Sequence, residues 1–413
     1  MTELLERAEK ALARDLCDHC LGRLFAHVDT GLSDQERGES LRMGVQLQRA
    51  LDGKEPIPAH QKCFVCEDLF TLVTRFADSV IEKLNGLEFD TFLVGTRVDP
   101  LVSEREEQVW ADVGQSTAET IKAELNQEIG KEVQRRIPQE VEFSTPDVVA
   151  LVDTRFSHVD LDITPLFVYG RYRKLSREIP QTRWPCNRCR GKGCQKCGGT
   201  GKMYQTSVQE IIGGPIMREA KGKDHFFHGM GREDIDARML GAGRPFVMEI
   251  VAPRRRGADL PSLEQAVNSA AEGRVAISID GWATRAEVEI LKSEKAHKKY
   301  RISVEVEGGI ARNELEEALD RLRGALIAQQ TPARVVHRRA DRIRERRVVD
   351  ARVAGQEDGI FFLDVVGEAG LYVKELVSGD NGRTRPSLAG LLGRPARVIQ
   401  LDVLEVEGRE EME

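Results

Sequence analysis

The chain has 413 residues, 40% of them apolar, so it is long enough for two or three domains with buried cores. No apolar run is long enough to cross a bilayer, and the charged first ten residues do not resemble a signal peptide. We therefore expect a cytoplasmic protein without membrane contact. The net charge of −7 argues against uniform attraction to nucleic acid, so an RNA-binding surface has to come from local clusters of basic residues.

All eight cysteines fall into Cys-x2-Cys pairs. The pairs are Cys17/Cys20, Cys63/Cys66, Cys186/Cys189 and Cys194/Cys197. In a reducing cytoplasm this pattern favours metal ligation over disulfide bonds. We predict two structural Zn²⁺ sites, one from the first two pairs and one from the last two. The alternative for the first set is four buried thiols in a core.

The first 180 residues divide into two predicted regions. Residues 1–66 read as a helical module with four cysteines, in which a capping box at 33–36 opens a helix that ends near Leu51. Residues 67–180 read as an α/β domain. Its predicted elements are a helix over 69–84, a strand over 89–94, a helix opened by a capping box at 116–119 and ended by Pro138, a strand over 148–152, and one or two strands in 160–169.

Residues 181–202 form a predicted second cysteine loop, rich in glycine. It resembles one CxxCxGxG unit of the J-domain co-chaperones, which is too short a match to predict a function. Five basic residues in it indicate either phosphate contact or a solvated metal loop: Arg188, Arg190, Lys192, Lys196 and Lys202. Residues 203–413 alternate between strands (246–251, 275–279, 300–306 and 361–366) and helices (263–271 and 313–327).

Three short elements carry the strongest functional signal. They are Gly231-Arg-Glu-Asp234, Lys298-Lys-Tyr300-Arg, and Leu371-Tyr-Val-Lys374-Glu. Alone, the aspartate is typical of a surface position, the tyrosine of a core strand, and the lysine of a helix surface. Their order along the chain and the segments around them change this reading.

The order of these elements, with segments 170–186, 231–249 and 374–386, resembles the archaeal tRNA pseudouridine synthases that act on uridines 54 and 55 of the T arm. The resemblance implies an α+β fold: an N-terminal zinc and THUMP-like α/β accessory domain, then a catalytic domain (203–413) on a mixed, largely antiparallel sheet flanked by helices. It also implies that Asp234 is the catalytic aspartate, that Tyr300 stacks on the target base, and that Lys374 pairs with Asp234. Lysine replaces the usual arginine there, which removes bidentate geometry.

The same resemblance implies tRNA as the partner, through its T arm, and we expect a monomer. Arginine-rich segments, including seven arginines between 334 and 347, indicate a phosphate track; the alternative is a solvated, salt-bridged helix. We predict substrate contacts from Tyr300, Arg232, Arg338, Arg339, Arg342, Arg383 and Arg385. The sequence leaves open whether position 54, position 55 or both are modified, and whether the aspartate acts as nucleophile or base.

Two other functions compete with this prediction. A THUMP-type RNA methyltransferase needs a glycine-rich cofactor loop after a strand, whereas Gly241-Ala-Gly243 precedes one. A non-catalytic, zinc-bearing tRNA-binding protein would make Asp234 dispensable.

Overall fold

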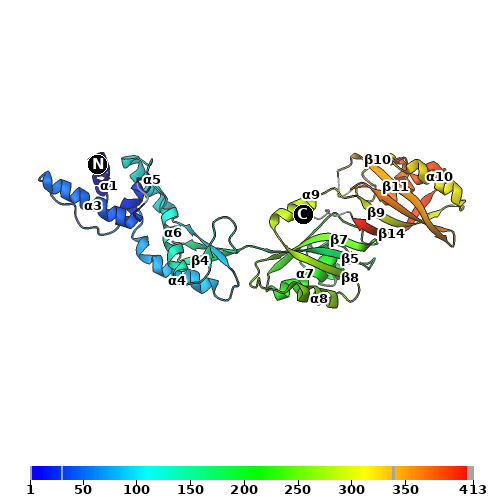
Figure 1. The fold of residues 1–413 in the computed structure, drawn as a ribbon, viewed down its shortest axis with the longest axis horizontal. Helices are drawn as coiled ribbons and strands as arrows, with labels where there is room; N and C mark the ends of the chain where they lie inside the picture. The colour runs from blue at the N-terminus through cyan, green and yellow to red at the C-terminus, as the bar shows by residue number, and fades with distance from the viewer. Residues whose placement is uncertain (1, 29–30, 337–339, 407–413) are drawn as a thin grey trace. The chain divides into compact units, whose positions relative to one another are not determined.

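The computed structural model describes residues 2–28, 31–336 and 340–406, drawn as a ribbon in Figure 1. They form two compact units, which meet in the chain between Thr164 and Pro165. None of the helices in these ranges combines the length and apolarity that crossing a bilayer requires.

The first unit begins with helices packed around the first cysteine set. Their bounds are α1 (Thr2–Leu12), α2 (Asp18–Gly22), η1 (Arg23–Phe25) and α3 (Asp34–Leu51). The predicted capping box of α3 is confirmed, because Ser33 accepts from the Glu36 N–H while Glu36 accepts from the Ser33 N–H. Buried apolar residues of α1, α2 and α5 (Pro100–Val113) form one core with three of the four cysteines, Cys20, Cys63 and Cys66.

The rest of the first unit is a four-stranded sheet with its own core. The strands run in the order β2 (Glu140–Val141), β1 (Thr91–Arg97), β3 (Val148–Asp153) and β4 (His158–Ile163), with only β3–β4 antiparallel. The helical elements are η2 (Leu69–Leu72), α4 (Val73–Leu84) and α6 (Ile121–Gln134). The capping box predicted at Ser116–Glu119 is wrong: the cap of α6 is Thr120, whose hydroxyl accepts from the Ala123 N–H.

The second unit is built on a ten-stranded sheet. Nine strands follow the order β13-β10-β11-β12-β9-β14-β7-β5-β8, and β6 pairs with β7. Only β14–β7 is parallel, so the predicted mixed and largely antiparallel sheet is confirmed. The bounds are β5 (Leu166–Lys174), β6 (Asp224–Gly229), β7 (Arg238–Val251), β8 (Val275–Ala283), β9 (Lys298–Val306), β10 (Leu326–Gln330), β11 (Ile343–Glu357), β12 (Ile360–Gly367), β13 (Thr384–Arg385) and β14 (Ala396–Val406).

Helices flank this sheet and complete its core. Figure 1 shows α7 and α8 beside the β5–β7–β8 portion, and α10 beside β11. Their bounds are η3 (Gln195–Cys197), α7 (Val208–Glu219), α8 (Leu260–Ala270), α9 (Arg285–Ser293), α10 (Arg312–Leu322), α11 (Val373–Ser378), η4 (Asp380–Gly382) and α12 (Leu388–Leu392).

Several sequence expectations differ from this fold. β5 pairs with β7 and β8 and so belongs to the second unit, whereas sequence analysis placed it in the 67–180 region. The helix predicted over 313–327 ends at Leu322, because the chain turns at Gly324 (φ 73°) and enters β10. The end of the arginine-rich segment is a strand and not a helix: residues 343–357 form β11, paired with β10 and β12.

Candidate active site

Asp234 lies on the loop between β6 and β7. Side chains from β5, β7 and the segment after β5 hold the backbone carbonyls of this loop. Arg244 donates to Met230 O (2.7 Å), and Gln181 donates to Gly231 O (3.0 Å). The fully buried ammonium of Lys174 donates to Asp234 O (3.0 Å), Ile235 O (2.8 Å) and Ile179 O (3.1 Å). The loop therefore presents Asp234 on a backbone with little freedom.

A buried ion pair lies directly behind the aspartate. Glu233 Oε2 is 3.0 Å from Arg244 Nε, and both side chains are at most 1% exposed. The Tyr172 hydroxyl donates to the Glu233 carboxylate (2.8 Å to Oε2) and accepts from Gln181 (2.8 Å). A buried ion pair costs desolvation free energy on both sides, and the hydrogen bonds from Tyr172 to Glu233 and from Arg244 to Met230 O offset part of that cost.

Two cations face the Asp234 carboxylate. Arg334 Nη1 is 2.9 Å from Asp234 Oδ2, and Lys374 Nζ is 3.5 Å from the same oxygen. Lys374 also binds Asp236 (2.8 Å), while Arg334 is held from behind by Glu375 (2.7 Å). The Asp234 side chain is 42% exposed, so a ligand can reach it.

Arg334 was predicted only as part of the phosphate track. Its place beside Asp234 depends on Glu375 in α11, and no local pattern around residue 334 indicates that contact.

Tyr300 comes from β9 and is 8% exposed. Burial raises the pKa of its hydroxyl to about 12, against the lowering effect of Arg244, so the ring stays neutral. Lys298, two residues earlier on the same strand, has its pKa lowered to about 8 by burial and by Arg244. Both residues line the same cavity as Asp234.

This cavity has a volume of about 530 Å³. All three sequence elements line it: Gly231 to Asp234 on one side, Lys298 and Tyr300 from β9, and residues 371–374 at the start of α11, with Arg334 among them. Carboxylate, aromatic ring and cations thus converge on one space that suits a base and its ribose.

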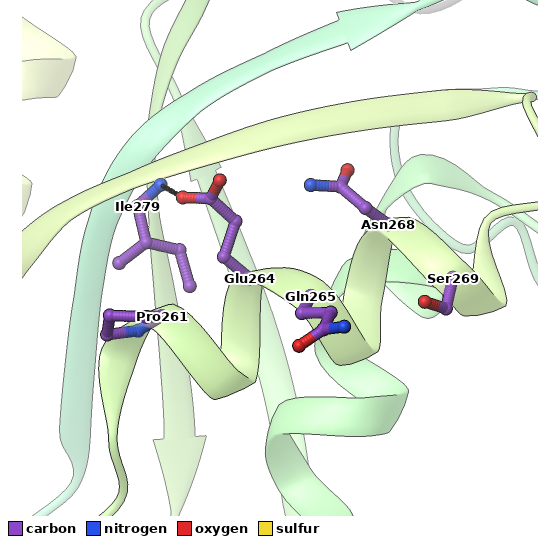
Figure 2. A pocket seen from close by; sticks show the side chains of 6 residues that line it. All are labelled: Pro261, Glu264, Gln265, Asn268, Ser269 and Ile279. Carbon is purple, nitrogen blue, oxygen red and sulfur yellow. Dashed lines mark hydrogen bonds between the residues drawn. The ribbon is translucent and has the colours of Figure 1, made fainter.

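A second hollow of about 740 Å³, shown in Figure 2, has no comparable set of groups. Its polar side chains are used by the fold: Glu264 accepts from the Ile279 N–H (2.8 Å), and Asn268 exchanges hydrogen bonds with the Ile277 backbone. The smaller cavity is therefore the candidate active site.

Two family models match the chain. The one described as "Pus10, C-terminal" matches residues 167–407, and "Pus10 THUMP domain, archaeal" matches residues 76–153. The "tRNA pseudouridine synthase Pus10" of Methanothrix thermoacetophila is 42% identical over 95% of this chain and 92% of its own length. The protein of the same name from Halorubrum lacusprofundi is 42% identical over 99% and 97%. The chain belongs to the Pus10 family.

The THUMP match covers most of the four-stranded sheet of the first unit, and the C-terminal match covers nearly all of the second. Among solved structures, one chain of a Cbf5–Nop10–Gar1 complex aligns with part of the present chain. The alignment covers 57% of the present chain and 48% of the chain in the complex, at 14% identity and a TM-score of 0.33. That likeness is too low to add to the family assignment.

The predicted substrate-binding arginines occupy different surroundings. Arg232 lines the cavity, with its guanidinium 5.2 Å from the centre of the Trp184 ring. Arg383 binds Asp341 and Thr331 O, and Arg385 donates to Gly382 O. Arg342 lies just before β11 and is exposed. Arg338 and Arg339 lie outside the described residues. The contacts of these arginines with RNA remain predictions.

Each set of four cysteines forms a compact cluster. Within each cluster the four sulfur atoms all lie within 4.8 Å of one another. Cys17 and Cys66 are 3.6 Å apart, and the second cluster gives 3.9 Å for Cys186–Cys194 and 3.7 Å for Cys194–Cys197. Four sulfurs around a tetrahedral ion with bonds of about 2.3 Å would stand about 3.8 Å apart. Both clusters therefore have the spacing to hold a metal ion.

Proposed function

We propose that the chain is a tRNA pseudouridine synthase that converts uridine to pseudouridine in the T loop, at position 54, position 55 or both. The observation that carries this proposal is the single cavity in which Asp234, Tyr300 and two cations meet. The family's curated relatives bear the name of this activity.

The reaction is an isomerisation and needs no organic cofactor. The C1′–N1 bond breaks, the uracil turns, a C1′–C5 bond forms, and the C5 proton leaves while N1 gains one. The target nucleotide has to leave the T-loop stack first, because C1′ and C5 are inaccessible while the base is stacked. An open cavity of about 530 Å³ can receive it.

Asp234 supplies the carboxylate for the bond-breaking step, either attacking C1′ or removing the C2′ proton. Its side chain lines the cavity and is 42% exposed, while hydrogen bonds from Lys174 and Gln181 hold the backbone of its loop. Arg334 and Lys374 contact this carboxylate directly as ion pairs. Arg334 makes the shorter contact, so the role inferred for Lys374 is shared between the two.

Tyr300 receives the flipped base on its ring. Base–aromatic stacking is worth about 1–3 kcal/mol per base, and it leaves the uracil free to turn in its own plane. The high pKa of the Tyr300 hydroxyl keeps the ring uncharged at physiological pH, which suits a stacking surface better than an acid or base.

The remaining contacts position the tRNA. Arg232 at the cavity, with Arg342, Arg383 and Arg385 on the second unit, would contact T-arm phosphates, and the THUMP domain would dock the far end of the tRNA by shape. We assign structural Zn²⁺ to both cysteine clusters; in the first it would tie two distant chain segments together, and in the second it would hold one short loop. We also propose that the enzyme is monomeric and, as tRNA is its substrate, that it acts in the cytoplasm.

The methyltransferase alternative finds no support at Gly241-Ala-Gly243. These glycines lie inside β7, where a Cβ would stand 2.0 Å from Leu404 O at the first and 2.8 Å from Tyr172 O at the second. Close strand packing, and not a cofactor loop, explains them.

The test is Asp234→Ala on a tRNA transcript, with pseudouridine mapped at each T-loop position. We expect no detectable product and a tRNA affinity within a few fold of wild type. The matched control is Asp236→Asn, which also removes a carboxylate that binds Lys374 but lies outside the cavity lining. Turnover by the Asp234 variant would rule out the mechanism, and loss of tRNA binding would indicate a binding role instead.

A further inference from the structure

The second cysteine loop is an excursion of the chain next to the candidate active site. A β-bridge between Pro185 and Lys202 closes its base. Trp184, directly before this bridge, packs against the guanidinium of Arg232, which lines the cavity. Gln181, slightly earlier, donates to Gly231 O on the catalytic loop. The base of the loop is therefore attached to the wall of the cavity.

Close backbone contacts make the loop rigid. Gly193 and Gly201 both have positive φ angles, and a Cβ would stand 2.6 Å from Gly199 O at the first and 2.3 Å from Gly191 O at the second. Only glycine allows the two turns of the loop to approach this closely. With the cysteine cluster between them, the turns present their side chains in a preformed arrangement, which reduces the entropy lost on binding.

The charge of this loop contrasts with the rest of the chain. The segment 185–202 contains no Asp or Glu, while the whole chain has a net charge of −7. Lys202 is paired with Glu210, and Lys196 donates to Asn187. Arg188, Arg190 and Lys192 are exposed, and their side chains make no ion pair with the residues that the structure describes. The loop stays positive even after a divalent ion bound by four thiolates is included.

We propose that this loop, through Arg188, Arg190 and Lys192, binds RNA phosphates that flank the target nucleotide. The inference rests on the proposed function, because it takes the nucleotide in the cavity as its reference point. The loop supplies sequence-independent attraction at the place where the base leaves the stack, and Arg232 bridges from the loop to the cavity.

The experiment measures the salt dependence of tRNA binding by the full chain. The wild type is compared with a triple variant that carries Arg188→Gln, Arg190→Gln and Lys192→Gln. The control is a double variant that carries Lys221→Gln and Lys223→Gln. The two control lysines are exposed and precede β6, at the opposite end of that strand from the catalytic loop. Bound metal is measured in every variant, so that a collapsed loop is recognised.

The slope of log K against log [salt] is negative, and each lost phosphate contact should reduce its magnitude by about 0.7–0.9. We expect the magnitude of the slope to fall by about 2 in the triple variant, with its metal retained. In the control variant we expect the magnitude to fall by less than about 0.5. An unchanged slope in the triple variant, or an equal loss in the control, would overturn the proposal. Because Asp234→Ala should keep the wild-type slope, an error in the catalytic assignment would appear in turnover and not in this measurement.

Discussion

Lys174 gives the most specific prediction about the free energy of unfolding. Its ammonium is fully buried beneath the loop between β6 and β7 and donates to three carbonyls. Burial lowers its pKa to about 8, against the opposing effects of Glu233, Asp236 and Asp234, whereas the unfolded chain keeps the ordinary lysine value of 10.5. The folded protein therefore loses this proton at a lower pH than the unfolded chain.

The sign of the pH dependence follows from proton counts. Between pH 8 and pH 10.5 the unfolded chain binds more protons at this site, so this lysine makes the free energy of unfolding rise with pH. Integrated from pH 8 to pH 10 between the two pKa values, the contribution is about 2 kcal/mol. Lys298, whose pKa is also about 8, contributes a similar rise to the free energy of unfolding. It is present in both proteins compared below, so its contribution cancels in their difference.

The assay is urea unfolding at several pH values between 8 and 10, followed by tryptophan fluorescence. A Trp110→Phe background leaves Trp184 and Trp282, which both lie in the second unit, as the reporters. We expect the wild type to gain about 2 kcal/mol relative to Lys174→Met across this range, since every other group titrates alike in both proteins. A constant difference between the two proteins would refute the reasoning, because it would mean that the lysine titrates normally in the fold.

Three further predictions concern the site and the metal clusters. Glu233→Leu should lower the free energy of unfolding of the second unit by about 3–5 kcal/mol, because Arg244 stays buried without its partner; adding Arg244→Met should recover part of the loss, and an additive effect would contradict this. Tyr300→Phe should keep most of the turnover rate, measured as pseudouridine formed per minute, since it keeps the ring; complete loss would assign chemistry to the hydroxyl. Native mass spectrometry should find two zinc ions per chain and one after Cys63→Ser/Cys66→Ser, whereas one ion in wild type would exclude a cluster.

The sequence predicted the elements that meet at the cavity better than it predicted the contacts between them. Asp234, Tyr300 and residues 371–374 do line one space. Their partners were harder to foresee. Lys174 stands in a segment that supported the family resemblance, but its role depends on carbonyls sixty residues further along the chain. A lysine on the buried face of β5, in register with Val168 and Tyr172, is the signal that could have identified it.

Element boundaries failed where tertiary contacts compete with local preference. The run after Asn313 has helical spacing, yet its last residues form β10, because pairing with β11 and β13 satisfies their backbone groups. Arg344 and Arg346 lie on one face of β11, which pairs with β10 on one side and with β12 on the other, and helical spacing could not anticipate that placement. Neither of these two differences affects the predicted positions of Asp234 and Tyr300 at the cavity.

By itself, the sequence determined which chemistry is available: eight thiols at metal-binding spacing, one carboxylate, one ring and basic residues in a fixed order. The thiols follow from their spacing, whereas the carboxylate, the ring and the basic residues were singled out by the family resemblance, and neither step needs knowledge of the fold. The tertiary structure decided which cation stands nearest the carboxylate, since Arg334 and Lys374 reach Asp234 across 100 and 140 positions of the chain. It also decided how the loop that carries Asp234 is held, because contacts between distant segments depend on strand order and register, which local sequence does not encode.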